Sequence, residues 1–183
     1  MKKALLIATV LFIAVISTAC INNIAVQELN NKAAEFMQKG DYEAAVNRLQ
    51  ASIDLDSTMY ETYYNLGIAA TNAKKFDIAI DALENGLKIK PDYANFYYSL
   101  AVAQAEYAEY ILNPIVDDNK EDVKKEISEE DKAKSTELKE SALANAQKYL
   151  EIAPNAEDKE TVEEFINDLN KVEQEEQPKV LEG

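Results

Sequence analysis

The chain has 183 residues, which is long enough for one domain with a substantial core. Its 34 acidic residues outnumber the 19 basic ones, giving a formal net charge of −15 at pH 7. Such a polyanion is repelled by phosphate backbones, so we expect no nucleic-acid binding. Histidine is absent and Cys20 is the only cysteine, which excludes the commonest general base and an internal disulfide. We therefore expect no metal, no cofactor and no enzymatic activity.

The first twenty residues are typical of a bacterial export signal. Met-Lys-Lys is followed by an uncharged apolar run over 4–16, and small residues then precede Cys20. The position of the cysteine resembles a lipobox, in which the cysteine is acylated and becomes the mature N-terminus. This resemblance implies a signal peptide over 1–19, a lipid on Cys20 and a short lipid-anchored linker over 20–25.

Two other interpretations of this segment remain open. Ser17 stands where the lipobox prefers leucine, and Ser17 with Ala19 also suits ordinary signal peptidase. A retained membrane anchor is the second alternative, although the apolar run is short for one. Residue 21, directly after the cysteine, is Ile and not Asp. By resemblance to the sorting signals of Gram-negative lipoproteins, this residue favours the outer membrane of the cell envelope.

A period of 34 residues is the main structural signal. Shifting the chain by 34 positions aligns 40–46 with 74–80 and 53–57 with 87–91. Two helices per unit with this period are typical of a helical repeat array.

The positions within the period resemble the tetratricopeptide repeat (TPR). In the best copy the pattern is filled by Tyr63, Leu66, Gly67, Ala70, Ala79, Leu83 and Pro91. The small residues Gly67 and Ala79 would let two helices cross closely. The resemblance implies an all-α, TPR-like α-solenoid of about three helix pairs over 26–154, with repeats over 26–59, 60–93 and 94–154.

The third repeat is interrupted by an insertion over about 111–138. Its first helix should end near Asn113, because the residue before Pro114 is pushed out of the helical region. A loop or helical turn over 115–127 would follow, and then a helix over about 129–152 that begins with a capping box at Ser128. The acidic run over 117–122 is either a solvated loop or a weak divalent-cation site.

The C-terminal part continues with helical spacing. Val162, Phe165, Ile166, Leu169 and Val172 recur on one face while glutamates occupy the other. We expect a capping helix over 155–174, which an exposed last repeat requires, and a disordered tail over 175–183.

The TPR resemblance also implies where a partner would bind. The first helix of each pair lines a concave groove in such arrays, and here that surface is rich in amides and has no Lys or Arg. Side-chain amides and tyrosine rings suit an extended peptide. Tyr64 and Tyr98 occupy equivalent positions, either on the binding surface or packed at its rim. The predicted partner-binding residues are Asn30, Ala34, Gln38, Glu61, Tyr64, Asn65, Ile68, Asn72, Asn95, Tyr98 and Val102. The wider predicted lining of the groove adds Gln27, Asn31, Met37, Thr71, Ser99, Ala105 and Glu106.

These features predict a membrane-tethered, non-enzymatic adaptor that binds a protein or peptide partner, with a role in assembling the cell envelope. A structural spacer or self-associating subunit of an envelope complex is the first alternative, and a homo-oligomer is consistent with so short an array. A carboxylate-based enzyme or small-ligand carrier is the second. It would need paired carboxylates in distinct environments, for which only Glu61 and Glu106 are candidates.

Overall fold

A computed structural model of the chain describes residues 23–113 and 127–176, with side chains up to residue 171. The predicted signal peptide over 1–19, the lipidation site Cys20, the acidic run over 117–122 and most of the predicted tail lie outside the described residues. The side chain of Val172 does as well. Those predictions therefore stay predictions.

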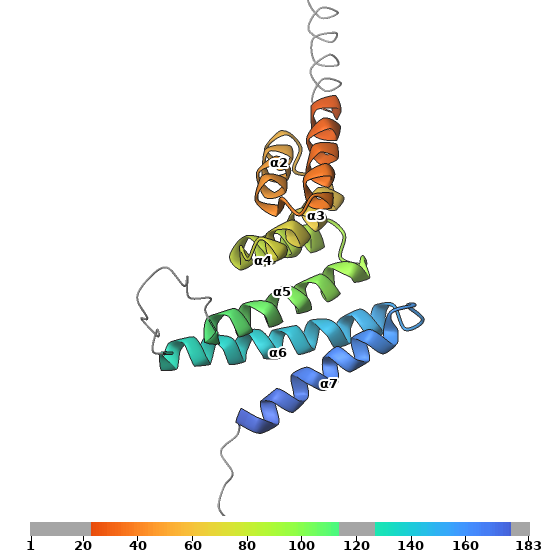
Figure 1. Cartoon of the computed structure of the whole chain (residues 1–183). Helices are drawn as coiled ribbons and strands as arrows, with labels where there is room; N and C mark the ends of the chain where they lie inside the picture. Colours follow the sequence, from red (N-terminus) through yellow and green to blue (C-terminus); the bar gives the residue numbers. More distant parts are fainter. Residues whose placement is uncertain (1–22, 114–126, 177–183) are drawn as a thin grey trace, which may run out of the picture.

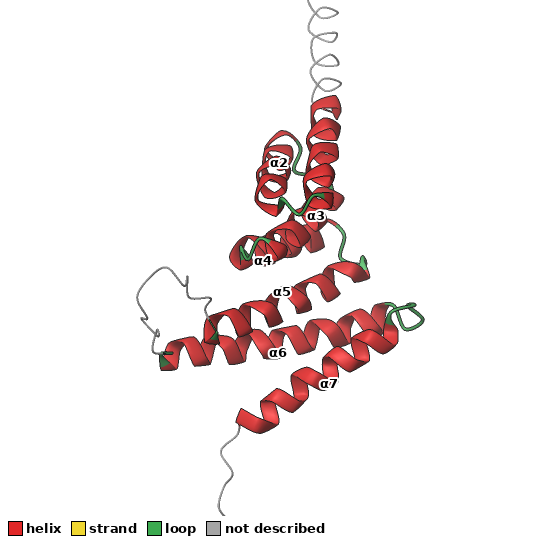
Figure 2. Cartoon of the chain, in the orientation of Figure 1, coloured by secondary structure: helices red, strands yellow, loops and turns green. Residues whose placement is uncertain are grey.

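The described backbone consists of helices joined by short turns and contains no strand (Figure 2). A helix described over 23–38, here the N-terminal helix, is followed by α2 (Tyr42–Leu55), α3 (Tyr60–Asn72), α4 (Phe76–Ile89), α5 (Ala94–Leu112), α6 (Glu129–Ile152) and α7 (Lys159–Glu176).

The helices stack in consecutive pairs along one direction (Figure 1). The N-terminal helix pairs with α2, α3 with α4, and α5 with α6, while α7 packs along α6 at the far end. The prediction of an all-α, TPR-like solenoid is thus confirmed. In such an array each unit contacts only its neighbours, so local packing between adjacent helices holds the fold together.

The buried residues form two clusters that meet at α5. Phe96 and Leu100 of α5 belong to the cluster that fills the space between the first two helix pairs and α5. Ala101, on another face of α5, belongs to a second cluster with α6 and α7. One helix therefore joins both halves of the core, and its position fixes everything that follows it in the chain.

Two glycines allow close approach between helices. A Cβ atom at Gly67 would lie 2.4 Å from Cγ of Leu83, so the predicted role of Gly67 is confirmed. A Cβ atom at Gly86 would lie 2.2 Å from the Phe96 ring, a contact that the sequence pattern did not indicate. Phe96 is fully buried and has edge-to-face contacts with Tyr64 and Tyr93, so its ring has little freedom to move aside.

The turn between the two helices of the first pair has the same geometry as the equivalent turn of the second pair, 34 residues later. Gly40 has φ +75° and Lys74, its equivalent, has φ +57°. In both turns the following residue donates its N–H to a carbonyl five residues earlier, from Asp41 to Phe36 and from Lys75 to Ala70. These are Schellman-type helix ends, in which glycine is the usual left-handed residue. Lys74 adopts this conformation with a side chain, at a cost of roughly 1 kcal/mol.

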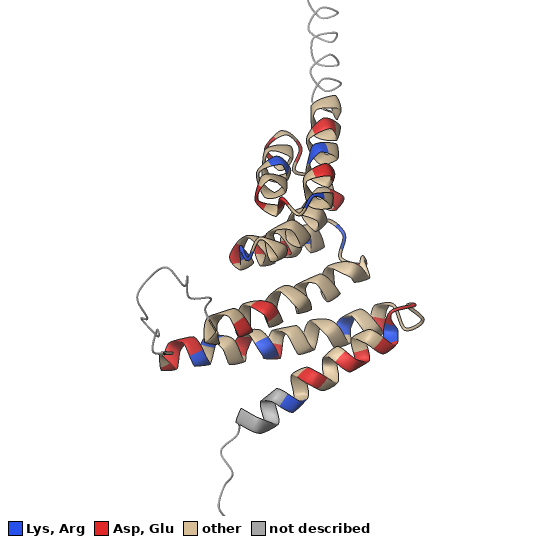
Figure 3. Ribbon diagram, viewed as in Figure 1, with Lys and Arg blue, Asp and Glu red and all other residues tan. Residues whose placement is uncertain are grey.

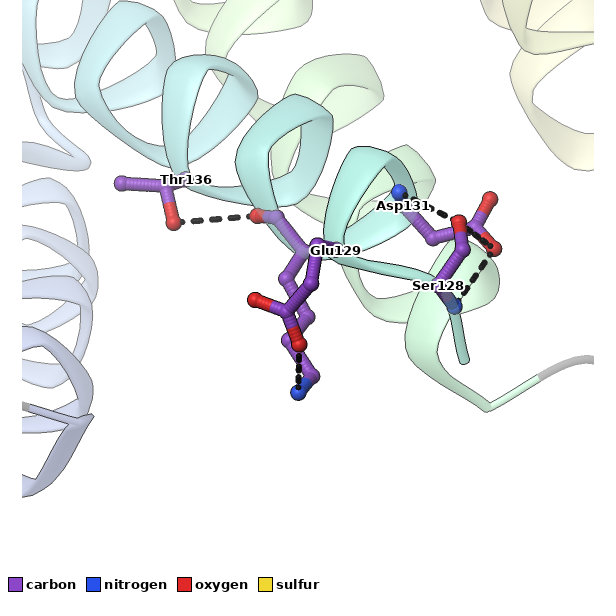
Figure 4. Close-up of polar contacts among 5 residues, drawn as sticks. Ser128, Glu129, Asp131 and Thr136 are labelled. Atoms are coloured by element: carbon purple, nitrogen blue, oxygen red, sulfur yellow. Dashed lines mark hydrogen bonds and ion pairs between the residues drawn. The ribbon is translucent and has the colours of Figure 1, made fainter. Parts of the chain in front are cut away.

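The insertion in the third repeat lengthens both helices of the pair. Helix α5 has 19 residues against 13 in α3, and α6 has 24 against 14 in α4. As predicted, the first ends just before Asn113 and the second begins at Glu129. The predicted capping box is present, because Ser128 accepts the N–H of Asp131 and its own N–H binds the Asp131 carboxylate (Figure 4).

Polar contacts join α5 to α6 along the lengthened hairpin. The Ser135 hydroxyl donates to the Ala108 carbonyl at 3.0 Å, and Asn145 donates to the side chain of Gln104 at 2.9 Å. Small side chains also lie in this interface, among them Ala101, Ala142 and Ala146, which are fully buried. Alanine at these positions lets the two backbones lie close together over a long distance.

The last helix begins later than predicted. Helix α7 starts at Lys159, whereas the spacing pattern placed a capping helix from 155. The residues before it form turns, and there Asp158 accepts a hydrogen bond of 2.5 Å from the Tyr149 hydroxyl. Burial and this carboxylate raise the pKa of Tyr149 to about 12. Helix α7 also continues through 175 and 176, the first residues of the predicted tail.

The close contact at Gly86 leads to a stability prediction. We expect Gly86→Ala to lower the free energy of unfolding by about 1–3 kcal/mol, because the overpacking against Phe96 outweighs the better helix propensity of alanine. Urea unfolding followed by far-UV circular dichroism measures the change. Asn85→Ala, at the exposed neighbouring position, is the control and should change little. A more stable Gly86→Ala protein would contradict the contact.

Candidate binding groove

Three of the predicted binding residues of the first two repeats meet in one shallow pocket. It has a volume of about 240 Å³ and lies between the N-terminal helix and α3. Polar side chains dominate its lining, which consists of Gln27, Asn30, Asn31, Met59, Glu61, Thr62 and Asn65. This amide pocket brings together Asn30, Glu61 and Asn65 from the predicted set.

Asn30, however, is already engaged in structural hydrogen bonds. Its Nδ2 donates to the Val26 carbonyl at 3.0 Å and to the hydroxyl of Ser52 at 2.8 Å, and its Oδ1 accepts from Thr62 at 3.3 Å. Ser52 of α2 and Thr62 of α3 are both buried. The amide therefore joins three helices, and little of its hydrogen-bonding capacity is left for a ligand.

Tyr64 is half-buried against the aromatic cluster around Phe96. Its ring centroid lies 5.6 Å from those of both Tyr93 and Phe96, in edge-to-face geometry. Tyr98 is half-buried in a second group, 5.4 Å from the Tyr149 ring and 6.1 Å from the Phe165 ring. Of the two interpretations given for these tyrosines, the geometry favours packing at the rim of the groove.

Another pocket lies between α5 and α7, with α6 behind it. Its volume is about 610 Å³. Apolar side chains dominate the walls and charged ones the edge, with a full lining of Val102, Ala105, Glu106, Glu109, Leu112, Asn113, Lys139, Phe165, Asp168 and Leu169. We call this site the α5–α7 pocket.

The pocket results from the way in which the last helix docks. Helix α7 packs along α6, while its backbone hardly approaches α5. The contact between Tyr98 and Phe165 closes the space at one end, near the start of α5. Towards Leu112, at the other end of α5, the two helices diverge (Figure 1), and the pocket lies between them.

Two glutamates of α5, Glu106 and Glu109, are the main charges at the mouth of this pocket. Burial raises the pKa of the Glu106 carboxyl, and Glu109 raises it further, while Lys74 lowers it by a smaller amount. Asp168 on the opposite edge is already paired with Lys171 at 2.9 Å.

A second, smaller pocket lies on the other side of these glutamates. Its volume is about 410 Å³, and it shares Glu106, Glu109 and Asn113 with the α5–α7 pocket. Phe76, Tyr110 and Lys74 complete its lining. Tyr107 fixes this region, because its ring stacks on Phe76 at 5.2 Å and its hydroxyl accepts from Lys134 at 2.8 Å.

The structure thus distributes the predicted residues over separate places. Val102, Ala105 and Glu106 line the α5–α7 pocket, whereas the amide pocket holds Asn30, Glu61 and Asn65. Glu61 and Glu106, the candidate carboxylate pair, therefore line different pockets. The other predicted binding residues line neither pocket, namely Ala34, Gln38, Tyr64, Ile68, Asn72, Asn95 and Tyr98. Four of these side chains are nevertheless exposed, those of Ala34, Gln38, Asn72 and Asn95.

Several residues of the α5–α7 pocket were missed at the sequence level. Leu112 belongs to the part of α5 that the repeat pattern could not align, and Glu109 and Lys139 lie just outside the insertion. Phe165 and Leu169 were recognised only as an apolar stripe. The width of that stripe was the available signal, because a capping helix that leaves part of its apolar face open can contribute to a groove.

Comparisons with known proteins agree with this architecture. The family model described as "TPR repeat" matches residues 33–70. None of the curated proteins matches the sequence closely enough to name a relative.

Solved TPR structures match most of the fold. The first TPR of Spaghetti (RPAP3), bound to the HSP90 peptide SRMEEVD, has a TM-score of 0.59 and 15% identity, covering 81% of this chain and 93% of that one. The TPR2B domain of yeast Sti1 in complex with pHsp70 has a TM-score of 0.56 and 17% identity, covering 81% and 98%. The Yersinia enterocolitica chaperone SycD, in complex with a peptide of the translocator YopD, has a TM-score of 0.55 and 16% identity, covering 82% and 94%.

These results define the class as a helical repeat protein and, within that class, its fold as a TPR solenoid. Among residues 23–113 and 127–176, no helix is both long and apolar enough to cross a membrane. The same part of the chain holds no group of three or more acidic or cysteine side chains arranged to bind a metal ion.

The hydrogen bonds of Asn30 lead to a second stability prediction. We expect Asn30→Ala to lower the free energy of unfolding by about 1–3 kcal/mol, because it leaves the buried Ser52 and Thr62 hydroxyls short of a partner. Asn31→Ala, at the exposed next position, is the matched control and should be neutral. If urea unfolding gave equal midpoints for both variants, Asn30 would not act as the structural link described here.

Proposed function

We propose that this protein is a non-catalytic adaptor whose concave face binds a segment of a protein partner, with the α5–α7 pocket as the main contact. The observation that carries the proposal is an open, mainly apolar pocket of about 610 Å³ on a TPR solenoid. A pocket of that size accommodates one or two large side chains of a ligand. The amide pocket at the other end of the array offers polar groups for peptide backbone.

The structural neighbours support a role in peptide binding. Those described above are recorded with an HSP90 peptide, with pHsp70 and with a translocator peptide. At 15–17% identity they share the fold, and the chemistry of the ligand has to come from this chain's own residues.

We further propose that the adaptor is tethered to a membrane of the bacterial cell envelope by a lipid on Cys20 and takes part in envelope assembly. The support is the export-signal pattern, with the sole cysteine directly after its small residues. Only a few residues separate Cys20 from the N-terminal helix, so the start of the solenoid would lie near the lipid surface.

Photo-crosslinking from the groove tests the binding role. A photoreactive amino acid at position 105, which lines the α5–α7 pocket, should crosslink a specific envelope protein in cells. The same group at Ala144, on the exposed face of α6, is the control and should not. Ala105 and Ala144 are both small helical positions, so the two proteins should fold alike. Tyr64 and Tyr98 are unsuitable probes because their rings pack against neighbouring helices.

The competing outcomes are distinct. A crosslink from position 105 to a second copy of the chain would favour the self-associating subunit. A partner captured equally from 105 and 144, or only from 144, would place the contact on another face and contradict the proposed site. In the expected case, Ala105→Leu should also abolish capture by an unmodified partner in a pull-down, because the larger side chain fills the pocket.

Metabolic labelling tests the tether. Cells supplied with an alkyne-tagged fatty acid should label the wild-type protein, and Cys20→Ser should remove the label together with the membrane-bound fraction. Ser17→Leu, which brings the segment closer to the lipobox, should preserve both. A label that persists in Cys20→Ser, or a membrane-bound fraction that survives without the label, would contradict lipid anchoring at this cysteine.

A further inference from the structure

Charge is unevenly distributed along α5. The helix contains no charged residue from Ala94 to Ala105, and then two glutamates, Glu106 and Glu109, lie three residues apart (Figure 3). Residues at this spacing lie on the same side of a helix. The two carboxylates therefore stand together, at the boundary between the α5–α7 pocket and its smaller neighbour.

We infer that the α5–α7 pocket selects a cationic segment of the partner, in which an apolar side chain enters the pocket and an adjacent lysine or arginine meets the carboxylates of Glu106 and Glu109. This assignment rests on the proposed function and adds the chemistry of the ligand to it.

The apolar half of the inference follows from the pocket walls. Val102 and Ala105 of α5 face Phe165 and Leu169 of α7, and all four side chains are half-buried without a ligand. A leucine-sized or aromatic side chain in this pocket would remove the remaining apolar surface from water. That burial is worth about 25 cal/mol for each Å².

The cationic half follows from the balance of charges at the mouth. Among the described side chains, the other ionisable groups that line these two pockets are Asp168, Lys139, Lys74 and Tyr110. Asp168 is paired with Lys171 on α7. Lys74 lies in the turn between α3 and α4, and Lys139 of α6 is largely buried behind the pocket. Despite these cations the pKa of Glu106 is raised, by burial and then by Glu109. A ligand cation at this edge would favour the negative form of both carboxylates.

The same charges discriminate against acidic ligands. A peptide rich in carboxylates would bring like charges against Glu106 and Glu109 at the pocket edge, which is unfavourable. Charge of this kind acts on specificity and association rate more than on total affinity. The apolar contact would therefore supply most of the binding energy, and the two glutamates would choose among apolar segments.

Binding to three synthetic peptides of equal length tests the inference. The peptides alternate leucine with lysine, with serine or with glutamate, and fluorescence anisotropy measures their affinity for the purified chain. We expect the Leu/Lys peptide to bind about tenfold more tightly than the Leu/Ser peptide and the Leu/Glu peptide to bind weakest. The preference should shrink as salt is raised from about 0.05 M to about 0.5 M.

Variants separate the local effect from the net charge of the protein. The double variant Glu106→Gln/Glu109→Gln should lose about fivefold in affinity for the Leu/Lys peptide and nothing for the Leu/Ser peptide. The control Glu35→Gln/Glu84→Gln removes the same charge from two exposed sites. Neither site lines any of the three pockets described above, so this variant should retain its affinity for the Leu/Lys peptide. Equal losses in both double variants would mean attraction to the polyanion as a whole and would overturn the inference.

Failure of this inference and failure of the proposed function are distinguishable. Leu/Ser and Leu/Lys peptides that bind equally, and lose affinity in Ala105→Leu, would retain the groove and overturn its cationic preference. If the peptides bound only to a truncated chain that ends at residue 176, the pocket would be occupied by the chain's own C-terminal residues in the full chain. That result would overturn the assignment of the pocket to a partner. Absence of binding by every peptide would also overturn it, while crosslinking from position 105 would still decide the adaptor role.

Discussion

The close approach of α4 to α5 at Gly86 is the constraint on which the rest of the solenoid depends. The fully buried Phe96 ring lies where a Cβ atom of residue 86 would stand, and Tyr64 and Tyr93 hold that ring edge to face. Because α5 also supplies Ala101 to the second core, this contact sets the direction of α6 and α7. The shape of the α5–α7 pocket therefore depends on the contact between α4 and α5, which lies outside the pocket.

The two pockets at opposite ends of the solenoid differ in chemistry. Near the N-terminal helix, side-chain amides such as that of Asn30 already form hydrogen bonds within the protein. Near α7 the surface is apolar, with Glu106 and Glu109 at its edge. Binding energy and selectivity would thus come from different residues, since burial of apolar surface supplies the first and the carboxylates of Glu106 and Glu109 the second. A groove of this kind would read the order of apolar and charged side chains in a segment.

The fold could largely be predicted from the sequence because its signals are local and repeated. The 34-residue period, the capping box at Ser128 and the proline after Asn113 each determine backbone geometry within a few residues. The site could be predicted only in part, because it depends on how helices far apart in sequence converge. The sequence placed Tyr64 in the predicted binding set and left packing at the rim open, and only its contact with Phe96 favours the rim. Glu109 and Lys139 flank an insertion that broke the alignment.

The way α7 docks has a thermodynamic consequence. This helix forms one wall of the α5–α7 pocket but packs mainly on α6, so it can detach without disturbing the first two repeats. A molecule that bridges α5 and α7 binds only the docked form and would raise the free energy of that detachment by mass action. Occupancy would then register as slower amide hydrogen exchange in α7, while exchange in α2 and α3 stayed the same.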